Sequence, residues 1–219
     1  MNTDVPKQLL ELKNESILES SIRKFHEHPG IDEIFIVSHP DLMEITRKMV
    51  EDKEYFKVSK ILPGGTTRQS SSEKGVTASE GEHRKILIHD SARPYVSPGM
   101  IARVLSALDH ADAVTPVIDS SDTLVCVDQK RYVNRYLERD NIKRVQTPQG
   151  FNRQTIVNAH RMAAAQSMST FTDDCSMVIH FGLSEVMLVD GDPLNIKITY
   201  KEDLRGNGVE SRGDHDQKM

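Results

Sequence analysis

The stretch Lys85-Ile86-Leu87-Ile88-His89-Asp90-Ser91-Ala92-Arg93-Pro94 decides the fold of this chain. Its first part, from Ile86 to His89, is short and mostly apolar, which is typical of a strand buried on both faces of a parallel sheet. Asp90 and Arg93 follow at the carboxyl edge, where open α/β sheets bind their ligands. An acid and a guanidinium at that edge indicate a site for an anionic substrate with a metal ion. A turn with a local ion pair would give the same pattern.

Strands and helices alternate along most of the chain. Besides the central strand, strands are expected at residues 31–37, 58–62, 113–118 and 186–189. Helices are expected to begin at Ser16, Pro40 and Ser97 and to span residues 154–166 and 175–180, because caps or prolines precede apolar residues at helical spacing. The alternation predicts an α/β fold, Rossmann-like, with a mostly parallel sheet and helices on both faces.

The alternation stops at a segment of about residues 119–141. Two extended pieces, Asp122 to Asp128 and Arg131 to Leu137, flank a turn and offer few apolar residues to pack inward. They predict an antiparallel β-arm that leaves the globule and holds a partner, most simply a second copy of the chain. The arm belongs to a single domain over residues 1–204, and residues 205–219 are expected to be an irregular tail.

Composition limits the classes of function. The 219 residues are 37% hydrophobic and 28% charged, without an 18-residue apolar run or a signal peptide, so no membrane association is expected. Cys126 and Cys175 do not form a disulfide framework, which favours a cytoplasmic location. The nine histidines show no metal-binding pairing. The net charge of −5 argues against nucleic acid, so an anionic ligand needs a local basic cluster.

Three further patterns carry chemistry, each with a plainer alternative. Gly64-Gly65, followed by Thr67 and Arg68, is typical of a phosphate- or base-binding turn but also of an ordinary loop. Lys197 lies between two isoleucines of an expected strand, 195–199, where an inward lysine needs a charged partner or an anion. Thr172-Asp173-Asp174 is best explained as a helix cap. His89 is interpreted as a packing residue, because no nucleophile accompanies it.

Seven motifs, in order, resemble those of the sugar-alcohol-phosphate cytidylyltransferase family, in particular the branch that uses 2-C-methyl-D-erythritol 4-phosphate. They are Pro6-Lys7-Gln8, Gly64-Gly65-Thr66-Thr67-Arg68-Gln69, His89-Asp90-Ser91-Ala92-Arg93-Pro94, Asp122-Thr123, Thr147-Pro148-Gln149, Thr172-Asp173-Asp174 and Asn195-Ile196-Lys197-Ile198-Thr199. The resemblance implies a nucleotidyltransferase that moves a cytidylyl group from CTP to a polyol phosphate and releases pyrophosphate. Ribitol 5-phosphate is the alternative substrate.

The resemblance also implies the roles of individual residues and a divalent cation, usually Mg²⁺. Lys7 and Lys197 would bracket the α-phosphate and neutralise the charge that gathers on it, and Arg139 would be the third catalytic residue. The nucleotide would be held by Gly64, Gly65, Arg68, Ser71 and Asp90, and the polyol phosphate by Arg93, Thr123 and Thr147. Because Thr123 and Arg139 lie on the arm, they would reach the partner's site in a homodimer. No residue is assigned as a direct metal ligand.

Two departures from the family are expected to matter. The family usually ends in a helix after Glu-Asp-Leu, whereas Glu202-Asp203-Leu204 is expected to lead into an irregular tail here. The family has a strand and a glycine-rich, arginine-bearing loop directly before the Pro-Lys-Gln motif, and only five residues precede Pro6 here. We therefore expect the sheet to lack this strand, with an open apolar slot and weak CTP binding. Two alternatives of another class remain at this point, an inactive dimerising remnant and a generic nucleotide-binding module.

Overall fold

The computed structural model describes residues 6–12, 14–79, 84–199 and 203. The helices in this part of the chain are α1 (Ile17–His26), α2 (Met43–Asp52), α3 (Arg68–Ala78), α4 (Pro98–Ala107), α5 (Arg153–Ala165) and α6 (Asp174–His180), with 3₁₀ turns η1 (Lys7–Leu9), η2 (Pro40–Leu42) and η3 (Arg139–Asn141). The strands are β1 (Glu11–Leu12), β2 (Glu15–Ser16), β3 (Ile34–Ser38), β4 (Val58–Pro63), β5 (Lys85–Ile88), β6 (Ala113–Asp119), β7 (Val125–Val127), β8 (Val133–Tyr136), β9 (Lys143–Val145), β10 (Gln149–Asn152) and β11 (Met187–Asp190).

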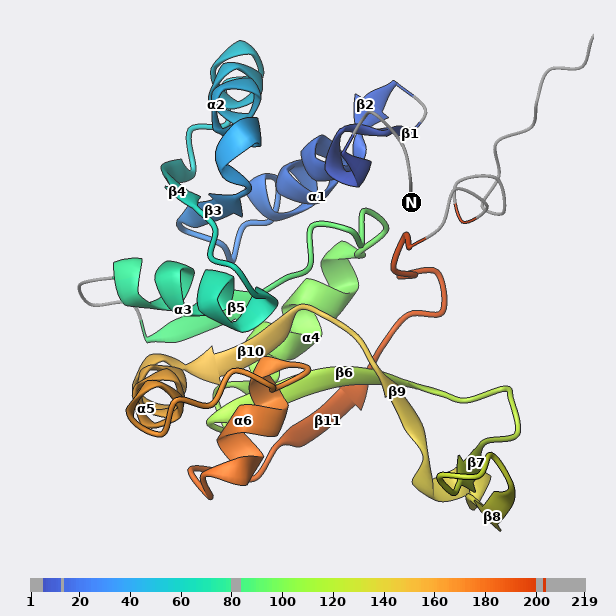
Figure 1. Ribbon diagram of the computed structural model, residues 1–219. Helices are drawn as coiled ribbons and strands as arrows, with labels where there is room; N and C mark the ends of the chain where they lie inside the picture. The colour runs from blue at the N-terminus through green and yellow to red at the C-terminus, as the bar shows by residue number, and fades with distance from the viewer. Residues whose placement is uncertain (1–5, 13, 80–83, 200–202, 204–219) are drawn as a thin grey trace, which may run out of the picture.

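The main sheet is mixed, which corrects the prediction of a mostly parallel sheet. Its order is β11-β6-β10-β5, with β9 paired to β6. β11 runs parallel to β6, whereas β10 is antiparallel to both β5 and β6. β3 and β4 form a separate parallel pair. The α/β class is therefore confirmed. The error comes from two unpredicted antiparallel strands, β10 in the middle of the sheet and β9 beside β6 (Figure 1).

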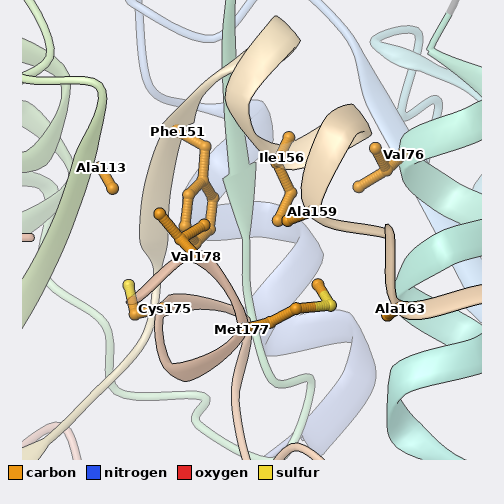
Figure 2. Close-up of a cluster of buried hydrophobic side chains, with 9 residues drawn as sticks. All are labelled: Val76, Ala113, Phe151, Ile156, Ala159, Ala163, Cys175, Met177 and Val178. Atoms are coloured by element: carbon orange, nitrogen blue, oxygen red, sulfur yellow. The ribbon is translucent and has the colours of Figure 1, made fainter. Parts of the chain in front are cut away.

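The core of the main sheet lies between β10 and the two helices α5 and α6. Figure 2 shows Phe151 of β10 among Ile156, Val178 and Met177, all of them fully buried. On the other face α4 approaches closely, because β10 has a glycine there: a β-carbon at Gly150 would lie 2.6 Å from Val104 Cγ1. Because β10 also pairs with β5 on one side and β6 on the other, it is a central strand and not an edge.

Local capping residues start the helices as expected. Ser16 accepts a hydrogen bond from the Glu19 N–H at α1, and Ser97 accepts one from the Met100 N–H at α4. Asp173 caps α6 in the same way.

The helix α3 was not predicted, although Thr67 and Ser70 form a capping box at its start. The strand expected at residues 195–199 does not form. The N–H groups of Asn195 and Ile196 bond within the preceding turn, to Asp192 O and Leu194 O, and the Ile198 N–H bonds to Ala92 O.

The antiparallel arm forms as predicted and stands away from the main sheet in Figure 1. β7 pairs with β8 so that Val125 lies opposite Tyr136 and Val127 opposite Val133. These four side chains share one face of the hairpin, since opposite and alternate residues point the same way. All four are exposed.

The tail expected at 205–219 lies outside the described residues. No helix in the described part has the length and apolar character to cross a membrane.

Candidate active site

A cavity of about 870 Å³ lies between the β3–β4 pair and the edge strand β5 of the main sheet. Consecutive residues 30–37 and 84–92 line it, together with Leu18, Ile22 and Phe25 of α1 and Val76 of α3. The free edges of β3 and β5 therefore border the same apolar space. Its lining also includes the polar residues Arg68, Ser71, Ser72, Asp90 and Lys197, and we take these as the candidate active site.

Asp90 is the centre of the polar group. Its two carboxylate oxygens are 2.8 Å from Lys197 Nζ and 3.3 Å from Arg68 Nε. Burial alone would raise the pKa of Asp90, but the hydrogen bond from Lys197 and the charge of Arg68 lower that pKa to about 2. The carboxylate is therefore ionised at neutral pH. The charged partner predicted for Lys197 is Asp90, although Lys197 lies on an irregular segment.

Three hydrogen bonds fix the backbone that carries Asp90. The Asp90 N–H donates to Thr147 Oγ1 over 3.0 Å, and Thr147 Oγ1 lies 3.1 Å from His89 Nδ1. His89 Nε2 lies 3.1 Å from the carbonyl oxygen of Arg93. Because a carbonyl can only accept, Nε2 carries the proton and Nδ1 accepts from the Thr147 hydroxyl. Thr147, expected to face a substrate phosphate, is buried and orients the Asp90 loop.

The loop before α3 supports Arg68 and Ser71. The Gly64 N–H donates to Ser38 O, and the Gly65 N–H donates to Ser71 Oγ over 3.0 Å. A β-carbon at Gly65 would overlap Ser70, so glycine permits this close approach. The loop thus delivers Arg68 to the cavity at the first position of α3.

Arg93 is held away from the polar group. Its Nη1 donates to the Asn195 carbonyl over 2.8 Å, and its Nη2 lies 3.4 Å from the Val145 carbonyl. Burial lowers the pKa of Arg93. Arg93 is absent from the residues that line the cavity. Its guanidinium therefore links the loop after β5 to the carbonyls of Val145 and Asn195.

The residues predicted on the arm form a second, separate group. Thr123 and Arg139 line a small pocket of about 80 Å³ at the base of the arm, with no residue in common with the large cavity. Lys7 begins η1, and its side chain lies outside the described residues. Gln8, next to Lys7, lines the large cavity. The chain alone therefore brings together Arg68, Ser71, Asp90 and Lys197, but not the arm residues.

Sequence reasoning missed Asp174, which is the second carboxylate partner of Arg68. Asp174 Oδ2 lies 2.8 Å from Arg68 Nη1, and Ser72 Oγ donates to Asp174 Oδ1 over 2.6 Å. Burial lowers the pKa of Arg68, but Asp174 and Asp90 more than offset this and raise that pKa above its ordinary value. The helix-cap explanation is correct for Asp173. It was applied to Asp174 as well, so the pairing of Asp174 with Arg68 was not predicted.

The described residues offer no ready-made metal cage. None of their His, Cys, Asp and Glu side chains form a group of three or more around a common point. Magnesium, however, commonly keeps several waters and binds through one or two carboxylates plus substrate phosphates. The ionised Asp90 at the cavity fits such a shared site. The donor set therefore suits a divalent cation held jointly by a nucleotide and the protein.

Comparisons with known proteins agree on one family. The family model described as IspD, 2-C-methyl-D-erythritol 4-phosphate cytidylyltransferase, matches residues 1–207. The enzyme of that name from Clostridium botulinum (strain 657) is 35% identical over 204 residues, which are 93% of this chain and 88% of the relative. A bifunctional IspD/IspF enzyme from Bartonella bacilliformis is also 35% identical, and the chain spans 50% of its length.

Solved structures give the same result. A 4-diphosphocytidyl-2C-methyl-D-erythritol synthase from Anaerococcus prevotii matches with a TM-score of 0.82 and 30% identity, covering 89% of this chain and 85% of that one. A 2-C-methyl-D-erythritol 4-phosphate cytidylyltransferase from Thermus thermophilus matches with a TM-score of 0.77 and 32% identity, covering 91% of both chains. Sequence and three-dimensional structure therefore point to the same relatives.

Proposed function

The chain belongs to the 2-C-methyl-D-erythritol 4-phosphate cytidylyltransferase family, and on that premise we propose that it transfers the cytidylyl group of CTP to 2-C-methyl-D-erythritol 4-phosphate. This nucleotidyltransferase reaction belongs to isoprenoid precursor biosynthesis. The observation that carries the proposal is the carboxylate of Asp90, which holds Arg68 and Lys197 together beside the cavity. The names of the relatives favour this substrate over ribitol 5-phosphate, and favour an enzyme over a remnant.

The reaction needs positioning and charge neutralisation rather than a covalent enzyme intermediate. A phosphate oxygen of the polyol phosphate forms a bond to the α-phosphorus of CTP, and the bond from that phosphorus to the β-phosphate oxygen breaks to release pyrophosphate. Negative charge is concentrated at the α-phosphate during the transfer. Lys197, with its flexible and partly exposed side chain, is suited to contact that charge. Lys7 would contact it from the other side.

The nucleotide would be held from the loop before α3. Arg68 and Ser71 provide side-chain donors beside the cavity, and Gly64 and Gly65 let a ligand approach the backbone there. Asp90 would face the ribose or the cation. Enzymes of this family generally depend on a divalent cation, and we propose Mg²⁺, held by the nucleotide phosphates and Asp90. The ion would supply charge neutralisation at the phosphates.

A homodimer through the arm would complete the site. The exposed apolar face formed by Val125, Val127, Val133 and Tyr136 supports this proposal, because a two-stranded hairpin is marginally stable without a partner surface. Thr123 and Arg139 at the base of the arm would then contact the substrate in the partner's site. Arg93 would bind the same substrate phosphate after releasing one of its carbonyl partners. A cytoplasmic location fits this reaction and the two free cysteines.

The family has a strand directly before the Pro-Lys-Gln motif. We propose that the cavity between β3 and β5 is the position that this strand takes in the family. In the described residues, β3 pairs only with β4 and β5 pairs only with β10, so one edge of each is free to accept a partner. Hydrogen exchange tests this. We expect the free-edge amides of β3 and β5 to exchange as fast as loop amides, and protection equal to that of the β5–β10 pair would contradict the proposal.

The test of the function is release of pyrophosphate from CTP and Mg²⁺ in the presence of each polyol phosphate. We expect turnover with 2-C-methyl-D-erythritol 4-phosphate, little with ribitol 5-phosphate, and loss of at least 100-fold in kcat for Lys197→Ala, on the order found for other preorganised charge contacts. The matched control is Lys48→Ala on α2, where the lysine is exposed and does not line the cavity. No turnover with either substrate would favour the dimerising remnant instead.

A further inference from the structure

Asp174 is buried and does not cap the helix that it begins. Asp173 accepts the capping hydrogen bond from the Ser176 N–H over 2.7 Å. The side chain of Asp174 is only 1% exposed and points to α3 instead, where it binds Arg68 and Ser72. His160 Nε2 of α5 lies 3.6 Å from the same carboxylate. A carboxylate in such a place needs charged and hydrogen-bonding partners, and here it has them.

The backbone of Asp174 is fixed to the centre of the sheet. The N–H groups of Asp174 and Cys175 both donate to Gln149 Oε1, over 3.2 and 3.3 Å. Gln149 belongs to β10 and is fully buried, and its Nε2 donates to Thr115 Oγ1 and Asp173 Oδ2. Asp174 is thus attached to the buried centre of the main sheet. Any group that Asp174 holds is placed relative to that sheet.

The site residues form a chain of alternating charges that starts at Asp174. Asp174 holds Arg68, Arg68 also contacts Asp90, and Asp90 holds Lys197. The two ends differ in their surroundings, because Asp174 is 1% exposed whereas Lys197 is 43% exposed. The Asp174 end is therefore shielded from solvent, and the Lys197 end is the one that can reach solvent or a ligand.

We propose that Asp174 is a positioning residue for the nucleotide site. Asp174 fixes the guanidinium of Arg68, and Arg68 keeps Asp90 in place when Lys197 leaves Asp90 for the phosphate. Asp174 therefore acts on CTP through Arg68 and makes no contact with the substrate. Because the target of Lys197 is the α-phosphate of CTP, the inference rests on the proposed function.

The experiment is a double-mutant cycle with the full chain. Asp174→Asn, Arg68→Gln and the double variant are compared by the dissociation constant for CTP with Mg²⁺, from calorimetry, and by kcat from pyrophosphate release. We expect each single variant to weaken CTP binding roughly tenfold or more, as is usual when a hydrogen bond to a charged group is lost. The double variant should bind CTP no more weakly than Arg68→Gln alone. Asp41→Asn is the control, since Asp41 is 86% exposed.

The inference would be overturned if the dissociation constant of the double variant for CTP rose by the product of the two single effects. Asp174 would then affect CTP binding independently of Arg68, as a general structural defect does. If Asp174→Asn does not fold, Ser72→Ala tests the same anchor without leaving a charge unpaired. It should weaken CTP binding roughly threefold, and should add nothing to Arg68→Gln. Unchanged binding in Ser72→Ala would likewise overturn the inference while leaving the function intact. A wild-type chain that neither binds nor turns over CTP would overturn both.

Discussion

The protonation of His89 should limit the stability of this protein at mildly acidic pH. His89 is neutral in the folded state, with Nε2 donating to the Arg93 carbonyl and Nδ1 accepting from Thr147. Burial of the imidazole lowers the pKa of His89 from 6.5 to about 4. A proton on Nδ1 would remove the acceptor for Thr147, whose hydroxyl also receives the Asp90 N–H. Acid should therefore loosen the loop that carries the candidate active site.

The size and direction of the effect follow from the two pKa values. The unfolded chain binds a proton at His89 below pH 6.5, whereas the folded chain does so only near pH 4. The stabilisation is therefore complete above pH 6.5 and is lost as the pH falls from 6.5 toward 4. A difference of roughly 2.5 units at 1.36 kcal/mol per unit gives about 3 kcal/mol. That is a large share of the 5–15 kcal/mol typical of folded proteins.

Urea unfolding of the wild type and of His89→Gln at pH 7.5 and pH 4.5 measures the effect. The free energy of unfolding of the wild type should fall by about 2–3 kcal/mol more than that of the variant, because most of the titration is complete at pH 4.5. His39→Gln is the control, since His39 is exposed. Parallel losses in the wild type and His89→Gln would refute the assignment of a neutral, doubly bonded His89.

Three further predictions concern the core and the arm. Phe151→Ala should lower the free energy of unfolding by about 3–5 kcal/mol, because the ring is fully buried; a loss below 1 kcal/mol in urea unfolding would show that the core of Figure 2 is not packed as described. Gly150→Ala should lower the free energy of unfolding by about 1–3 kcal/mol, because the new β-carbon overpacks against Val104. Gly99→Ala is the control, since Gly99 has space for a β-carbon, and it should cost less than about 1 kcal/mol. Equal losses in the two variants would argue against the close approach of α4. If the proposed dimer forms through the arm, the wild type should sediment as a dimer and Val127→Asp, on the exposed face of the arm, as a monomer; equal sedimentation coefficients would exclude the arm as a dimer interface.

Most helices could be predicted because their signals are local. Ser16, Ser97 and Asp173 each accept a backbone hydrogen bond at the helix start, so the residue type alone marks the boundary. The strands β3, β4, β6 and β11 were predicted from apolar runs, within a few residues of the observed ends. Helix α3 was missed because its residues, rich in serine, lack an apolar stripe, and only Val76 of its hydrophobic side chains is buried.

The strand β10 could not be predicted from its residues. Gln149-Gly150-Phe151-Asn152 contains no β-branched residue, and it forms a strand because β5 and β6 offer edges on both sides. Gly150 would count against a strand in isolation, but here it makes room for α4. Tertiary pairing thus overrides local propensity and reverses the direction of the central strand. The expected parallel sheet therefore failed at β10, and also at β9, which runs antiparallel to β6.

The candidate site was partly predictable for a similar reason. Lys197 between two isoleucines indicated a charged partner, and the acid at the end of β5 was an available one. Nothing in the sequence near Asp174 indicated Arg68, which is 106 residues away, because the capping pattern already accounted for the acidic pair. The positions of Thr147 and Arg93 depend on backbone groups of distant segments, which no motif records.

The relative strength of the ion pairs decides which cation is free to meet a phosphate. Two carboxylates and two cations cancel in the row Asp174, Arg68, Asp90 and Lys197, so the group attracts an anion only after one pair opens. Removing one partner of a buried pair costs about 3–5 kcal/mol, because a charge stays unpaired in a dry place. A solvent-exposed pair is worth only about 0–1 kcal/mol. The Lys197–Asp90 pair lies between these two limits, because Lys197 is 43% and Asp90 17% exposed, whereas Asp174 is 1% exposed. An incoming triphosphate can therefore displace Lys197 from Asp90 more cheaply than Arg68 from Asp174.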